Sequence, residues 1–173
     1  SRFGKYLQLQ FDRQEAAVGQ RFPPTKLAGS KCEVYLLEKS RICTHDEKER
    51  TFHIFYQIVA ANDKDKVEIW SGLKNTTFKS FKYIGPSPCD GFEGMSAHDH
   101  YYITKRILAL IDAKDDAFLT LMRAITMTIQ LGNITFGKKF GDADKSTVTS
   151  KAELEGIAQL GGFDERELEL AFT

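Results

Sequence analysis

The chain has 173 residues, enough for one domain with a hydrophobic core or for one large subdomain of a longer protein. Its 24 Lys and Arg balance its 24 Asp and Glu, which argues against a nucleic-acid binder that works through bulk positive charge. The sequence contains neither a signal peptide nor an apolar run long enough to cross a bilayer, so we expect a soluble cytoplasmic protein. Three cysteines, Cys32, Cys43 and Cys89, match no zinc-binding spacing, and we expect reduced, mostly packed thiols.

The first predicted elements are two strands. Alternation of apolar and polar residues in KYLQLQF predicts a strand from Phe3 to Phe11 with one polar face. A loop with the breakers Pro23, Pro24 and Gly29 follows, and the run CEVYLLE predicts the partner strand from Lys31 to Glu38. Because two strands alone do not form a stable sheet in water, we expect these two to belong to a larger sheet.

From residue 44 onward the hydrophobic period becomes helical. Thr44 and Glu47 have the spacing of a capping box, which predicts a helix that begins there. Ser96 and Asp99 predict the start of a second helix. The expected apolar stripes are Phe52, Phe55, Tyr56 and Val59 on the first helix, and Ile103, Ile107, Leu110 and Ile111 on the second.

Three more helices are predicted downstream. The first of them is expected to end at Gly132. The second begins with the cap of Ser150 and Glu153 and ends at the Gly161–Gly162 pair, and Asp164 with Glu167 begin the third. Their inward-facing residues are Phe118, Leu121, Met122, Ile125 and Ile129, then Leu154, Ile157 and Ala158. The predicted fold is therefore α+β and mainly helical, with a strand segment at residues 1–43 and a helical segment at residues 44–173.

Two short stretches are candidates for chemistry. The opening SRFGKY is either a solvated loop that enters a strand or a phosphate-sensing loop, in which the Ser1 hydroxyl ligates Mg²⁺ and Arg2 pairs with a carboxylate. The triplet His98-Asp99-His100 does not predict a metal site, since residues two apart on a helix face different directions.

Five stretches of the chain resemble the myosin motor domain in collinear order. SRFGKY resembles the end of the myosin switch I motif, N-x-N-S-S-R-F-G-K and an aromatic. The segment LAGSKCEVYLLEKSRI resembles A-G-x-x-x-x-x-Y-L-L-E-K-S-R, and ERTFHIFYQIVAA resembles E-R-x-[FY]-H-I-F-Y-Q. FKYI and IQLGNITF are similar to F-x-Y-L and I-L-H-L-G-N-I-x-F. These stretches are residues 1–6, 27–42, 49–61, 81–84 and 129–136, and only 62–72 and 85–99 match weakly.

The resemblance implies roles for the first two residues. The chain is expected to begin inside switch I, so that Ser1 ligates Mg²⁺ and Arg2 pairs with the switch II glutamate. No stretch has the G-x-x-x-x-G-K-[ST] spacing of a phosphate-binding loop. Asp90-Gly91-Phe92-Glu93 lacks two residues of the switch II pattern D-x-x-G-F-E and precedes LGNITF, so it is interpreted as a turn.

The resemblance also places residues 44–173 in the upper 50K subdomain, the upper wall of the actin-binding cleft, with residues 1–43 as the end of switch I and two strands of the transducer sheet. The family's loop 4 corresponds to GKKFGDADKS, residues 137–146. Its lysines, Lys138, Lys139 and Lys145, are expected either to meet acidic residues of actin or to lie on a solvated surface loop.

Two hypotheses of function follow. In the first, the chain is part of a myosin, an actin-activated Mg-ATPase of the P-loop class in the cytoplasm and cytoskeleton. Its cofactors would be Mg²⁺ and ATP. Its partners would be actin, the rest of the motor, and light chains or calmodulin that bind regions outside this chain. Any coiled coil or tail would also lie outside this chain. The chain alone is expected to be inactive without the phosphate-binding loop and switch II. In the second, it is a stand-alone, non-enzymatic module that binds actin or another protein.

Overall fold

The computed structural model divides the chain into two compact units, Ser1–Ile42 and Cys43–Thr173. For residues 13, 139 and 142–144 only the backbone is described. The described parts of the chain are residues 4–13, 15, 18–19, 25–35, 44, 46, 49–85, 94–139 and 142–173.

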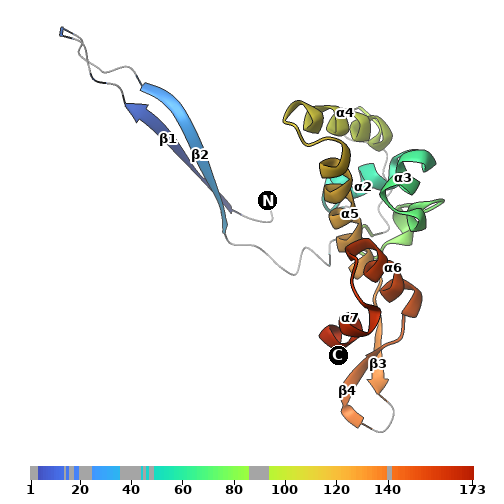
Figure 1. The fold of residues 1–173 in the computed structure, drawn as a ribbon. Coiled ribbons are helices and arrows are strands. Elements are labelled where there is room, and N and C mark those ends of the chain that lie inside the picture. The colour runs from blue at the N-terminus through green and yellow to red at the C-terminus, as the bar shows by residue number, and fades with distance from the viewer. Residues whose placement is uncertain are drawn as a thin grey trace. The chain divides into compact units, whose positions relative to one another are not determined.

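The first unit contains an antiparallel hairpin of β1 (Gly4–Arg13) and β2 (Thr25–Tyr35) (Figure 1). Gly4 lies opposite Tyr35, and a bulge between Gln10 and Phe11 shifts the register. The prediction of a second strand that begins at Lys31 was wrong, because β2 begins six residues earlier. Gly29 is not a loop breaker but lies inside β2 opposite Gln10, beside the bulge, where a residue without a side chain is tolerated.

Apolar side chains are exposed on the hairpin. They are Tyr6, Leu7, Leu9, Phe11, Leu27, Val34 and Tyr35. Cys32 is a free, exposed thiol on β2, so the expectation of a packed thiol was wrong for this residue, and Cys43 and Cys89 lie outside the described residues. A two-stranded hairpin is marginally stable in water, so these exposed side chains support the expectation of further strands beside it.

The second unit is built mainly from helices (Figure 1). Its helices are α2 (His53–Ala60), α3 (Asp63–Ile69), α4 (Ala97–Leu110), α5 (Asp115–Leu131), α6 (Lys151–Gly161) and α7 (Glu165–Phe172). Two short 3₁₀ turns are η1 (Ser71–Leu73) and η2 (Phe78–Ser80). A second antiparallel hairpin joins β3 (Phe136–Lys139) and β4 (Asp142–Val148). The predicted α+β, mainly helical fold is confirmed.

The hydrophobic core of this unit lies between α2, α4 and α5 and the turns that follow α3. Its buried members are Phe55, Tyr56, Ile58, Val59, Ala61, Ile69, Leu73, Phe81, Ile84, Ala97, Tyr101, Phe118, Met122 and Ile129. The Tyr56 hydroxyl donates a 3.0 Å hydrogen bond to the buried carbonyl of Ile84, which ties α2 to the segment after η2. Leu154, Ile157 and Ala158 of α6 are buried as predicted.

The helix predicted from Thr44 begins nine residues later. Phe52 is the N-cap of α2 and makes no side-chain cap, while Thr44 lies outside any helix and Glu47 lies outside the described residues. The capping-box prediction was therefore wrong for this helix. Burial of Phe55 and of its neighbours along α2 sets the helix, because packing of an apolar face contributes more to a short helix than a local cap does.

Other caps agree with the predictions. Ser96 accepts a hydrogen bond from the Asp99 amide at the start of α4, and Asp164 accepts two at the start of α7. Ser150 is the N-cap of α6, but its hydroxyl accepts a hydrogen bond from the Thr135 amide instead of capping the helix. Gly162 ends α6 in the left-handed conformation, with φ of 68°.

Helix α4 buries a different face from the one predicted. Ile107, Leu110 and Ile111 are exposed, whereas Ala97 and Tyr101 are buried. The Tyr101 ring packs edge-on against Phe118 of α5, and Tyr102 and Leu108 also pack against the core. Helix α3 was not predicted at all, although Asn62 caps it by accepting a hydrogen bond from the Asp65 amide.

Candidate functional site

The stretch expected to be a surface loop, residues 137–146, is for the most part the β3–β4 hairpin. Phe136 pairs with Val148 and Lys138 with Ser146. A shift of register follows Lys138, so that Lys139 pairs with Asp142. The loop prediction was therefore wrong for the described part of this stretch. Strand pairing satisfies its backbone hydrogen bonds and gives the lysines defined positions on a ladder.

The base of the hairpin is held by threonine and serine side chains. The Thr149 amide donates to the Thr135 carbonyl at 2.9 Å, and the two hydroxyls of these residues lie 2.7 Å apart. The Thr135 amide donates to the Ser150 hydroxyl at 2.8 Å. Val148 is buried and anchors β4. The hairpin therefore extends from a fixed base at the start of α6.

Helix α7 supports the other edge of the hairpin. The Thr147 hydroxyl donates to the Glu169 carboxylate at 3.3 Å, and the Lys151 ammonium lies 2.6 Å from the same carboxylate. The hydrogen bond from Lys151 lowers the pKa of Glu169, with a smaller contribution from Thr147. Glu169 thus stays ionised at neutral pH and joins β4, α6 and α7.

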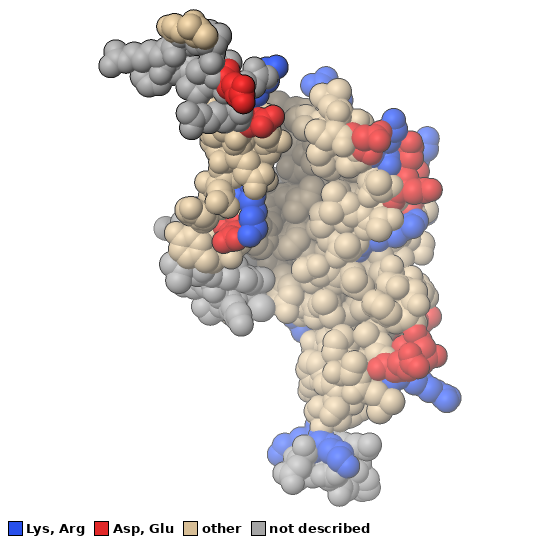
Figure 2. All heavy atoms as spheres, turned by 60° about the vertical axis from the view of Figure 1, so that its left-hand side comes forward, with Lys and Arg blue, Asp and Glu red and all other residues tan. Residues whose placement is uncertain are grey.

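The predicted lysines lie on this hairpin. Lys138 and Lys145 are exposed, and Figure 2 shows positively charged side chains, in blue, at its free end. Lys138 pairs with Ser146, whereas Lys145 lies in the irregular part of β4 where the register shifts. The side chain of Lys139 lies outside the described part of the structure.

The other residues predicted to belong to a site are not grouped into one by the described structure. Ser1, Arg2 and the turn Asp90–Glu93 lie outside the described residues. His98 Nδ1 lies 3.3 Å from the Asp99 carboxylate, which also accepts a 2.7 Å hydrogen bond from the Ser96 hydroxyl. Within the described ranges, no three His, Cys, Asp or Glu side chains are grouped as metal ligands. No described helix is long and apolar enough to cross a membrane.

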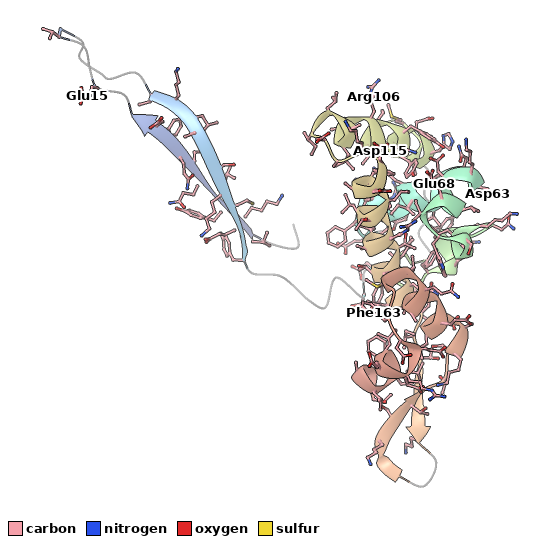
Figure 3. The ribbon with its side chains drawn as sticks, viewed as in Figure 1. Glu15, Asp63, Glu68, Arg106, Asp115 and Phe163 are labelled. Atoms are coloured by element: carbon pink, nitrogen blue, oxygen red, sulfur yellow. The ribbon has the colours of Figure 1, made fainter. Side chains whose placement is uncertain are left out.

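A partly buried ion pair links α3 to α4, and the sequence patterns did not predict it. The Lys105 ammonium lies 2.7 Å from one Asp65 carboxylate oxygen, and the Tyr102 hydroxyl donates to the other at 3.0 Å. Burial by itself would raise the pKa of Asp65, but the bonds from Lys105 and Tyr102 outweigh it and lower that pKa. Figure 3 shows the side chains of α3, α4 and α5 in this region, with Glu68 and Asp115 labelled.

Signals for this pair exist in the sequence. Asn62 and Asp65 have the spacing of an N-cap and its third helical residue, which predicts α3. Tyr102 and Lys105 are three residues apart on α4 and so share one face. What the sequence lacks is the contact between the two helices, which only the tertiary structure supplies.

The second unit is therefore a helical unit that carries an anchored β-hairpin with exposed lysines, and the first unit contains an exposed β-hairpin. The family model of the myosin head (motor domain) matches residues 1–173. The chain belongs to the myosin motor-domain family. This agrees with the resemblance found in the motifs of switch I and of the segments after it.

Several curated myosins are similar to this myosin chain. Unconventional myosin-Ic of Danio rerio is 31% identical over 173 residues, which cover 100% of the chain and 16% of that protein. Myosin-16 of Arabidopsis thaliana is 32% identical over 154 residues, or 89% of the chain and 11% of that protein. Myosin-52 of Schizosaccharomyces pombe is 29% identical over 143 residues, or 83% and 9%. The chain thus spans less than a fifth of each relative.

Proposed function

We propose that this myosin chain is part of an actin-activated Mg-ATPase motor of the cytoplasm and cytoskeleton, in which it supplies the end of switch I and the upper wall of the actin-binding cleft. The observation that carries the proposal is the match to the motor-domain family along all 173 residues. The helical unit, with its own core and an anchored basic hairpin, supports the assignment to the cleft. Light chains or calmodulin would bind regions outside this chain.

The nucleotide part of the proposal rests on the motif SRFGK. Ser1 would ligate Mg²⁺ and Arg2 would pair with a glutamate of switch II, while ATP supplies the phosphoryl group that is transferred to water. Such a site works by positioning and by charge stabilisation, and both need the donors of a phosphate-binding loop. No stretch of this chain has the spacing of that loop.

Residues 1–173 alone are therefore expected to show no measurable ATP turnover. The measurement is phosphate release by the purified 173-residue chain with Mg²⁺, ATP and actin filaments. The control is the intact protein that carries this sequence, which is expected to hydrolyse ATP faster when actin is added. ATP turnover by the isolated chain that disappears in Arg2→Ala would contradict the expectation that the missing phosphate-binding loop is required.

The actin contact is proposed for the β3–β4 hairpin. Lys138 and Lys145 are exposed on a hairpin whose base is fixed by Thr135, Thr149 and Ser150, so their charges are held away from the helical core. Exposed charges at the rim of an interface act mainly on the association rate and on its dependence on salt. We therefore propose that these lysines attract an acidic surface of actin and so speed the association of this chain with actin.

Replacing both lysines, Lys138→Ala with Lys145→Ala, is expected to slow actin association by about three- to tenfold at low ionic strength. The difference from the unmodified protein should shrink as salt is added, because salt screens exposed charges. The measurement is the rate of actin binding by the intact protein, followed by light scattering in stopped flow across a salt series.

The matched control is Lys64→Ala with Lys74→Ala, two exposed lysines outside the hairpin. This variant removes the same charge from the chain and is expected to retain the rate of the unmodified protein. Equal slowing in both variants would assign the effect to net charge. No slowing in the hairpin variant would mean that the hairpin does not contact actin.

The second candidate is a non-enzymatic module that binds actin or another protein through the same hairpin. It is favoured by the compact helical unit, which has its own core. The intact mass of the native polypeptide, measured after immunoprecipitation, separates the two. A mass several-fold above 19.6 kDa, with peptides from a phosphate-binding loop, supports the motor, and a mass close to that value supports the module.

A further inference from the structure

We draw no further inference here: the strongest candidate, the exposed apolar patch that Ile107, Leu110 and Ile111 form at the C-terminal end of α4, carries none, because nothing in the described part of the structure shows what covers it.

Discussion

Replacing Ile129 by alanine is expected to lower the free energy of unfolding by about 3 kcal/mol, within the range found for Ile→Ala in packed cores. Ile129 is 0% exposed and lies on α5 in the core formed with α2 and α4. The deletion leaves a cavity, because close-packed neighbours relax only in part. The measurement is urea unfolding of the 173-residue chain, followed by the fluorescence of Trp70, its one tryptophan, which packs against this core.

Ile107→Ala is the matched control for this prediction. Both isoleucines belong to the apolar stripes predicted from the sequence, but Ile107 is 52% exposed on α4. Its replacement is expected to change the free energy of unfolding by no more than about 0.5 kcal/mol, since exposed substitutions on a helix have small effects. Similar losses in the two variants would mean that α4 buries the face that contains Ile107, contrary to the structure.

Lys105→Met is expected to lower the free energy of unfolding by about 1–2 kcal/mol at pH 7, a value reduced from that of a fully buried pair because Lys105 is partly exposed. The substitution leaves the Asp65 carboxylate with the Tyr102 hydroxyl as a donor but without a cation. Apolar packing of the lysine stem is largely retained by methionine. The measurement is the same urea unfolding by Trp70 fluorescence.

The same variant changes the dependence of stability on pH. The pKa of Asp65 is lowered in the folded chain below its usual 3.8, so the carboxylate stabilises the fold above that value and loses its contribution as pH falls through the lowered pKa. The unmodified chain is therefore expected to lose more stability than Lys105→Met between about pH 5 and pH 3.

The control for the ion pair is Lys114→Met. Lys114 lies 3.0 Å from the Asp112 carboxylate, but both side chains are exposed, so this pair is screened by water. The variant is expected to retain both the stability at pH 7 and the acid dependence of the unmodified chain. If Lys105→Met and Lys114→Met have the same acid dependence, the pair with Asp65 does not stabilise the fold.

Local patterns predicted the elements that depend on nearby residues. The α+β, mainly helical class, the cap of α4 at Ser96, the cap of α7 at Asp164 and the end of α6 at the glycine pair all agree with the structure. Capping and helix termination depend on atoms within a few residues, so sequence spacing found these three ends, although it failed at Thr44 and the Ser150 hydroxyl bonds to Thr135 instead of capping α6. The family resemblance likewise follows from motifs that are contiguous in the chain.

Predictions that needed a distant partner were the ones that failed. The start of α2 followed burial of Phe55 and its neighbours instead of the Thr44 box, and residues 137–146 formed a hairpin because β3 could pair with β4. The extra length of β2 came from pairing with β1 across a bulge. Local signals were present in each case, but the pairing or burial of a distant segment contributed more free energy.

The sequence by itself determined the class of this protein, its family and the capped ends of three helices, because these depend on neighbouring residues. Tertiary structure alone decided which face of α4 is buried, since Tyr101 meets Phe118 while Ile107 remains in water. It also brought Asp65 of α3 to Lys105 of α4. Burial and charge pairing arise between elements far apart in the chain, and no pattern within one element specifies its partner.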